Sequence, residues 1–298
     1  MTLRFRAVIA SQYALHFLHA ADGKGGEIHS TFRNTINLRF PGDQLVCLHS
    51  GRELIAPFGI AVGQRFHSPA FERIVPGIRV QAADDVLRAA DVGLEVTLGG
   101  TPVWEPRARP MSLAPEAAAR HAEILEAILL QHDNPDGLAG LVNGAGATPL
   151  LRRAQASTGT LIEGFARRDA ARLVAGAEPL LGLGPGLTPS GDDFLAGFLG
   201  TAMLAWPSAA ALLHDAGRQV LHLAESRTTL LSRAFLAHAL RGVLAPPVDA
   251  LAAAMFEDAG QPAVARAARS AASLGHTSGL DTLAGMAFAL RSLAQVGP

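Results

Sequence analysis

The sequence predicts an α+β protein: a β-rich module over residues 1–110, with an antiparallel sheet or small barrel, followed by a mainly α-helical module over residues 111–298. Three observations support this prediction. Short apolar segments broken by glycine and proline fill the first module, and alanine and leucine recur at helical spacing in the second. The segment between them, 105–115, holds three prolines. Strands and helices segregated along a chain are typical of the α+β class.

The N-terminal module contains several candidate strands. They are short runs of β-branched and apolar residues, separated by turn signals such as Pro41-Gly42-Asp43 and Pro76-Gly77. Pro57 lies inside the third run, where its missing backbone N–H favours an edge strand or a bulge. The runs cover residues 35–40, 44–49, 54–62, 78–81 and 92–98.

The C-terminal module is predicted to consist of helices, because its apolar residues recur at a spacing of three and four. The longest apolar run, 194–206, is too short to span a bilayer and follows two aspartates, so it predicts a buried core helix and no membrane partner. The expected helices cover residues 115–132, 149–178, 192–205, 208–224, 227–242, 247–258, 262–274 and 280–294.

Composition limits the partners and the compartment. The chain carries 25 basic and 26 acidic residues, which argues against a nucleic-acid partner. Cys47 is the only cysteine, so an internal disulfide and a cysteine-based zinc site are excluded and a reducing compartment is favoured. The N-terminus lacks a signal-peptide pattern, and we therefore expect a cytoplasmic protein. Lys24 is the only lysine and belongs to no P-loop motif.

A short internal repeat is the most informative feature of the chain. Residues 190–197 and 278–285 both read S-G-x-D-x-L-A-G, and a threonine stands shortly before each copy, at Thr188 and Thr277. The first copy ends a loop of glycines and prolines, G-L-G-P-G-L-T-P-S-G-D-D, over residues 182–193. Glycines permit backbone angles that are closed to other residues and a close approach to the main chain.

Two interpretations of the repeat remain open. In one, Ser190 with Asp193 and Ser278 with Asp281 are capping pairs of two ordinary helices. In the other, both helix starts bind a small anion through backbone N–H groups and hydroxyls. If the copies face each other, Asp193 and Asp281 flank one site. The ligand-binding candidates are then Gly184, Gly186, Leu187, Thr188, Ser190, Gly191, Thr277, Ser278 and Gly279.

The aspartates complicate an anion site, because ionised carboxylates repel an anion. Either Asp192 and Asp193 bind Mg²⁺ that bridges to the ligand, or the ligand donates an N–H to them, or they point away to cap helices. Mg²⁺ is the one cofactor that the residues leave open. Asp192, Asp193 and Asp281 are candidate catalytic residues, together with His276, whose alternatives are ligand contact, acid–base work and helix capping.

Four residues outside the two loops also bear on a site. Asn37 interrupts a predicted strand, where it orients a ligand or closes a turn. Cys47 lies within a predicted strand, and we predict that it is a small core residue rather than a nucleophile. Thr229 and Ser232 begin a helix, where they cap it or line the same site.

Residues 184–195 and 275–285, with weaker matches at 29–32, Asn37, Thr229 and Ser232, resemble the AllH-type subunit of oxamate carbamoyltransferase, from anaerobic allantoin catabolism. The resemblance implies a transferase subunit that acts with two other subunits. The complex would split oxalurate with phosphate into oxamate and carbamoyl phosphate. The resemblance carries over no catalytic residue, so the site candidates rest on the repeat.

The sequence therefore predicts a subunit of a carbamoyl-transferring enzyme, with a site for an anionic or carbamoyl substrate between residues 182–193 and 275–281. Such a reaction needs donors for a developing oxyanion and a carboxylate that holds the carbamoyl NH₂ group. A Mg²⁺-dependent phosphoryl or nucleotide-binding enzyme is one alternative. A non-catalytic subunit whose loops dock another chain is the other.

Overall fold

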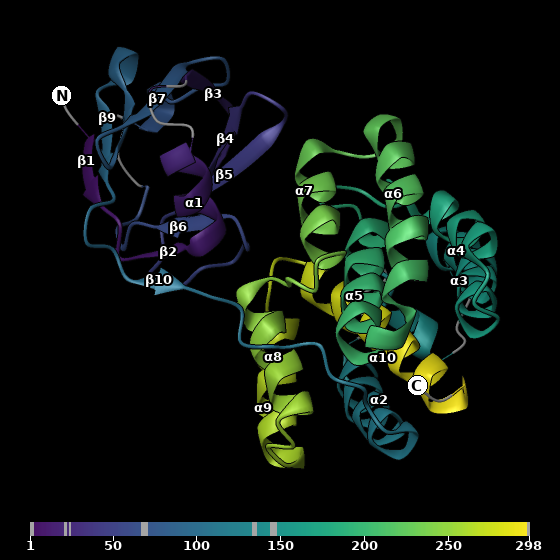
Figure 1. Ribbon diagram of the computed structural model, residues 1–298. Helices are drawn as coiled ribbons and strands as arrows, with labels where there is room; N and C mark the ends of the chain where they lie inside the picture. The colour runs from purple at the N-terminus through teal and green to yellow at the C-terminus, as the bar shows by residue number, and fades with distance from the viewer. Residues whose placement is uncertain are drawn as a thin grey trace. The chain divides into compact units, whose positions relative to one another are not determined.

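A computed structural model describes residues 3–20, 23, 25–66, 71–132, 136–143 and 148–296; Lys24 lies outside them. The chain divides into two compact units, residues 1–105 and 106–298 (Figure 1). The N-terminal unit holds a curled sheet and the C-terminal unit is helical, so the α+β prediction is confirmed.

The N-terminal unit is built on one mixed sheet whose strands, within the described residues, follow the order β1-β9-β8-β7-β3-β4-β5-β6-β2-β10. Antiparallel pairs join β3, β4 and β5, and also β7, β8 and β9, whereas β5 and β6 run parallel. The strands are β1 Leu3–Arg6, β2 Ile9–Ser11, β3 Gly25–Phe32, β4 Thr35–Phe40, β5 Gln44–His49, β6 Gly59–Ala61, β7 Arg79–Ala83, β8 Val86–Ala89, β9 Leu94–Thr97 and β10 Val103–Trp104.

Helix α1, Gln12–Ala20, packs against this sheet, with the rings of Phe17 and Phe40 5.3 Å apart. The structure also corrects two predicted strands. The run 54–62 forms a strand only over β6, after Pro57. The run 92–98 becomes a strand only after Gly93, whose left-handed backbone ends a 3-10 turn. Both strands are therefore shorter than predicted, because Pro57 and the turn at Gly93 precede them.

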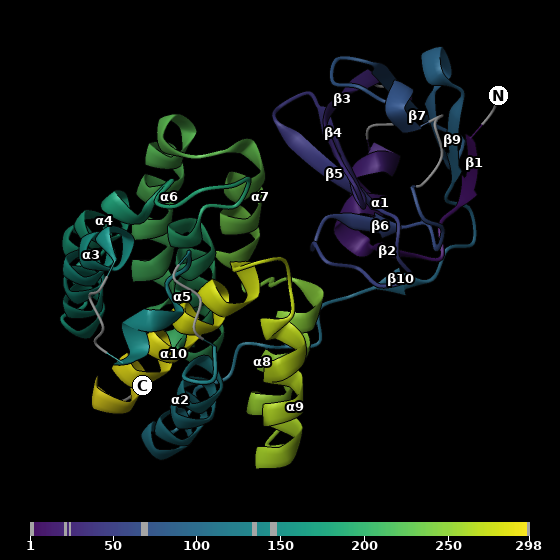
Figure 2. The ribbon, with the colours of Figure 1, turned by 180° about the vertical axis from the view of Figure 1, so that it is seen from behind.

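The C-terminal unit consists, within the described residues, of helices packed around one apolar core. Helix α5 is buried along its whole length, as expected for the apolar run, and packs across α10, which in turn packs on α2 (Figures 1 and 2). The helices are α2 Pro115–Leu129, α3 Pro149–Ala166, α4 Ala170–Ala177, α5 Ser190–Ala205, α6 Ala210–Arg227, α7 Leu230–Ala239, α8 Pro246–Phe256, α9 Gln261–Ala272 and α10 Ser278–Val296.

The single helix predicted over 149–178 is wrong, because the structure has two. Arg168 adopts a left-handed φ of 56°, which interrupts the helix. Asp169 then caps α4 by accepting a hydrogen bond from the Arg172 N–H at 3.1 Å. The two helices lie so close that a Cβ on Gly176 would stand 2.3 Å from the Leu161 nitrogen.

The repeat fixes the crossing of α5 and α10. A Cβ on Gly197 would lie 2.1 Å from the Thr282 carbonyl oxygen, and a Cβ on Gly285 would lie 2.0 Å from the Phe194 carbonyl oxygen. These glycines occupy the same position in the two copies, and each contacts the residue that follows the aspartate of the other copy. The crossing is therefore reciprocal, and it brings the two helix starts together.

No single helix among the described residues is both long and apolar enough to cross a bilayer; Ser190–Ala205 and Pro207–Arg227 pass that test only as a pair, bent by 108°.

Candidate functional site

The two S-G-x-D segments meet at the starts of α5 and α10. The Thr188 and Ser278 hydroxyl oxygens lie 3.0 Å apart, although 90 residues separate them in the chain. Asp193 and Asp281 are 7% and 0% exposed, and the charge of Asp281 acts on Asp193. The structure thus brings the two repeat copies to one place.

Each aspartate interacts with the serine of the other copy. The Ser278 hydroxyl lowers the pKa of Asp193, and the Ser190 hydroxyl lowers the pKa of Asp281. Helix α5 is capped at Pro189, without a side-chain hydrogen bond, so Ser190 is not its N-cap. Ser190 and Asp193 therefore interact across the helix pair and do not form a capping box with each other.

Burial dominates the electrostatics of the two carboxyl groups. Desolvation raises the pKa of Asp193 well above its ordinary value, and the nearby charge of Asp281 raises it further. Desolvation also raises the pKa of Asp281, to about 6. The Oδ2 atom of each carboxyl group is buried and has no hydrogen-bond partner within the described residues. Each carboxyl group thus has one buried oxygen whose hydrogen-bonding capacity the described residues leave unused.

A third segment completes the surroundings of Asp281. The Leu138 N–H donates a hydrogen bond to Asp281 Oδ1 at 2.5 Å. A Cβ on Gly137 would lie 2.7 Å from the same oxygen, so a larger residue there would displace the Asp281 carboxyl group. Sequence analysis did not find this segment, because a backbone donor leaves no side-chain signature; the Asp136-Gly137 turn dipeptide was the available signal.

Asp192 has a different role from its neighbour. Its Oδ1 atom accepts a hydrogen bond from the Gly182 N–H at 3.0 Å, and its Oδ2 atom accepts one from the Thr228 hydroxyl. Burial raises the pKa of Asp192, and these donors lower it again. Both carboxylate oxygens are thus engaged, and Asp192 positions the loop that leads into α5.

The arrangement gives little support to a Mg²⁺ site. Both oxygens of Asp192 already accept hydrogen bonds, from the Gly182 N–H and the Thr228 hydroxyl. In the part of the chain that the structure describes, no group of three or more His, Cys, Asp or Glu side chains is placed to hold a metal ion.

The glycine-rich loop is fixed at both ends. Gly182 has a φ of +69°, and a Cβ there would lie 2.1 Å from the Arg227 carbonyl oxygen, so the position requires glycine. The Thr229 hydroxyl donates to the Leu187 carbonyl oxygen at 2.6 Å and accepts the Ser232 N–H at 3.0 Å. Thr229 therefore caps α7 and holds the loop. Within the loop, the residues Gly186 and Leu187 are exposed.

The backbone amides do less than the anion interpretation expects. The Gly191 N–H donates to the Leu183 carbonyl oxygen at 2.8 Å, and the Gly279 N–H donates to the Leu274 carbonyl oxygen at 2.9 Å. A Cβ on Gly191 would lie 2.0 Å from the Leu180 carbonyl oxygen. Both glycines serve close packing. These two amides are therefore not free to bind an anion.

Gly184, Thr277 and His276 border the aspartate pair in different ways. Gly184 packs on Ser190, its φ of +113° turning the loop toward α5. His276 is exposed, with Nε2 3.5 Å from Asp136 Oδ2, and the adjacent Thr277 hydroxyl lowers the pKa of Asp281.

Asn37 belongs to the N-terminal unit, in the middle of β4 rather than in a turn. It donates to the Ser30 hydroxyl at 3.0 Å and accepts from the Cys47 thiol at 2.9 Å. Burial raises the pKa of Cys47 well above its usual range, so the thiol stays protonated, in keeping with a core residue.

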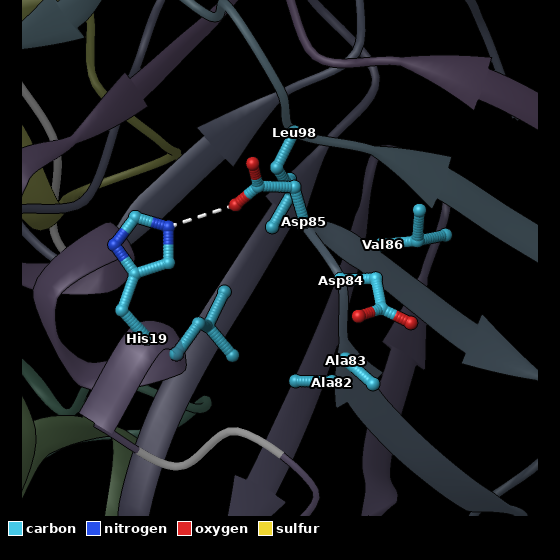
Figure 3. A pocket seen from close by; sticks show the side chains of 8 residues that line it. His19, Ala82, Ala83, Asp84, Asp85, Val86 and Leu98 are labelled. Carbon is cyan, nitrogen blue, oxygen red and sulfur yellow. Dashed lines mark hydrogen bonds and ion pairs between the residues drawn. The ribbon is translucent and has the colours of Figure 1, made fainter.

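The N-terminal unit also contains hollows at its surface. One, of about 330 Å³, lies between α1 and the β7–β8 turn, where His19 Nε2 is 2.9 Å from Asp85 Oδ1 (Figure 3). Asp84 and Asp85 both have positive φ, as a tight two-residue hairpin turn requires. The two polar side chains in this pocket are thus hydrogen-bonded to each other.

Two family models match the chain. Residues 180–290, which contain both repeat copies, match the model described as oxamate carbamoyltransferase subunit AllH. Residues 6–103 match the AllH family N-terminal domain. No solved structure matches the chain.

Proposed function

Because the chain belongs to the AllH family of oxamate carbamoyltransferase subunits, we propose that its paired aspartates bind the carbamoyl group which that enzyme transfers. One observation carries the proposal: two buried carboxyl groups, Asp193 and Asp281, stand at the meeting point of the repeat copies, each with an oxygen that has no partner among the described residues. The site would act within a complex that includes other subunits.

The two carboxyl groups complement a carbamoyl group. A carbamoyl group offers a carbonyl oxygen, which accepts hydrogen bonds, and an NH₂ group, which donates them. The raised pKa of Asp193 favours its protonated form, a donor to the carbonyl oxygen. Asp281, with a pKa of about 6, is mostly ionised at neutral pH and accepts from the NH₂ group. Neutralising one carboxyl also reduces the repulsion of an anion.

The proposed reaction balances without a cofactor. A phosphate oxygen forms a bond to the carbamoyl carbon of oxalurate, and the bond from that carbon to the oxamate nitrogen breaks. The leaving nitrogen takes up a proton, and the attacking hydrogenphosphate gives one up. A protonated Asp193 stabilises the charge that develops on the carbonyl oxygen during the attack.

The test uses the assembled complex with its partner subunits, assayed for phosphorolysis of oxalurate. Asp193→Asn and Asp281→Asn should each lower kcat/KM by roughly 100-fold or more, the scale of losing a group that stabilises a transition state. Asp249→Asn is the matched control, because Asp249 is a buried aspartate with a raised pKa whose oxygens accept the backbone N–H groups of Arg107 and Ala108. Its turnover should stay close to wild type.

Two further readouts separate the alternatives. If both site variants turn over normally, the carbamoyl proposal is wrong. If they fail to assemble with the partner subunits, the segment is a docking surface, a role to which the exposed Leu187 is suited. A reaction that stops on removal of divalent cations would favour phosphoryl chemistry instead.

A further inference from the structure

A cleft of about 530 Å³ opens in the N-terminal unit, and three arginines line it: Arg33, Arg52 and Arg65. Ser50, Gly51 and Glu53 also line the cleft. We call this the arginine cleft. Its volume lies in the range of small-molecule sites.

The sheet topology explains why these residues converge. Strands β5 and β6 run parallel, so their carboxyl ends lie at the same edge of the sheet. Arg52 follows the end of β5 and Arg65 follows the end of β6. Arg33 lies in the β3–β4 turn, at the same edge, because Thr35 pairs with His49. Three segments distant in sequence thus bring a guanidinium group to one cleft.

The positive charge of the cleft is not neutralised within the protein. None of the three arginines forms an ion pair within 4.0 Å or a hydrogen bond with another described residue. Burial lowers the pKa of His49, which also lines the cleft, to about 3, so His49 is neutral. Glu53 supplies one negative charge, and three arginines leave a surplus of two positive charges.

Some arginines elsewhere in the chain form ion pairs, whereas others, such as Arg6, stand singly at exposed positions without one among the described residues. At another surface hollow of the same unit, Arg39 pairs with Asp43 at 2.7 Å and with Glu27 at 3.7 Å. In the helical unit, Arg291 pairs with Glu126 at 2.5 Å. The arginine cleft differs in that three unpaired arginines line one hollow, where a single anion could contact more than one of them.

We propose that the arginine cleft binds a small molecule that carries phosphate or carboxylate groups. A guanidinium group donates two parallel hydrogen bonds to such an oxyanion, and more than one arginine can contact a ligand with several oxygens. The proposal concerns the N-terminal unit alone and does not depend on the aspartate pair of the helical unit.

The test is calorimetric titration of the full chain at constant ionic strength, with inorganic phosphate and with oxalate as probes. At least one probe should bind saturably, and the difference between them shows whether phosphate or carboxylate is preferred. Arg52→Gln and Arg65→Gln should each weaken binding by about 3- to 10-fold, and the double variant by more, as expected for charge-assisted hydrogen bonds at an exposed site.

Two variants serve as controls. Arg6→Gln removes an exposed arginine of the same unit outside the cleft, and its affinity should stay within about twofold of wild type. Asp193→Asn should also retain binding, which distinguishes this cleft from a site in the helical unit. The proposal is overturned if neither probe binds saturably in the millimolar range, or if the triple variant Arg33→Gln, Arg52→Gln, Arg65→Gln binds as well as wild type. Circular dichroism confirms that each variant is folded.

Discussion

The buried carboxyl group of Asp281 lowers the stability of the fold when it is ionised, whereas the proposed function requires the ionised form. Its side chain is fully buried, one oxygen accepts the Leu138 N–H, and the other has no partner among the described residues. An ionised carboxylate in such a place costs free energy that a protonated one does not. The pKa of about 6 expresses this cost. A group retained against it is expected to serve a purpose other than stability.

The pH dependence of unfolding tests this account of Asp281. The folded pKa of about 6 lies above the ordinary 3.8, so between these values the native state binds more protons than the unfolded state. Stability therefore falls as pH rises from about 4 to about 6, by about 3 kcal/mol for this group. Asp281→Asn keeps the oxygen that accepts the Leu138 N–H and carries no charge.

We expect Asp281→Asn to be more stable than wild type by about 1–3 kcal/mol at pH 7, while at pH 3.5 the difference should vanish. Urea unfolding at both pH values measures it. Other carboxyl groups titrate in both proteins and largely cancel in the comparison. Equal stabilities at pH 7 would mean that burial does not strain this carboxylate.

Among the elements, α5 and α10 show what the repeat does structurally. Gly197 and Gly285 let each helix approach the backbone of the other, and backbone carbonyls at the crossing cannot move aside as a flexible side chain can. This close approach places the two aspartates at one site. The glycines of the repeat are thus as important to the site as its polar residues.

Gly197→Ala and Gly285→Ala should each destabilise the protein by about 1–3 kcal/mol or more, since the added methyl group overlaps a carbonyl oxygen. Gly159→Ala in α3 is the matched control, because a Cβ there meets nothing within 4 Å. It should be neutral or stabilise by up to about 1 kcal/mol through helix propensity. Chemical denaturation gives all three values; similar results for Gly159→Ala and Gly197→Ala would contradict the crossing.

The sequence was sufficient to predict most helices, because apolar spacing and terminal prolines are local signals. It did not predict α1 or the strands β1 and β3, which are shaped by tertiary pairing, as when Leu3 pairs with Leu94. For the site, the repeat predicted convergence of residues 182–193 and 275–281. The exchange of serine partners between copies depends on the crossing angle, and the Leu138 N–H depends on the backbone, so neither has a sequence signal.

At the scale of the whole molecule, the chain has two separate apolar cores. One lies within residues 3–98 and the other within residues 108–293, so neither core draws residues from both units. The connection leaves the first unit at Glu105, and Asp249 holds the next backbone N–H groups, those of Arg107 and Ala108, to the second unit. Units with their own cores are expected to unfold as separate cooperative transitions.

Differential scanning calorimetry of the full chain should therefore resolve two transitions that respond to different changes. Gly197→Ala should lower the transition temperature of the helical unit alone, by several degrees for a loss of 1–3 kcal/mol. Phosphate or oxalate should raise only the transition of the N-terminal unit, because a ligand stabilises the unit that binds it. Gly159→Ala without ligand gives the baseline for the helical unit. A single transition that both changes shift together would show that the units unfold as one, and the two sites would then be coupled through stability despite their separate cores.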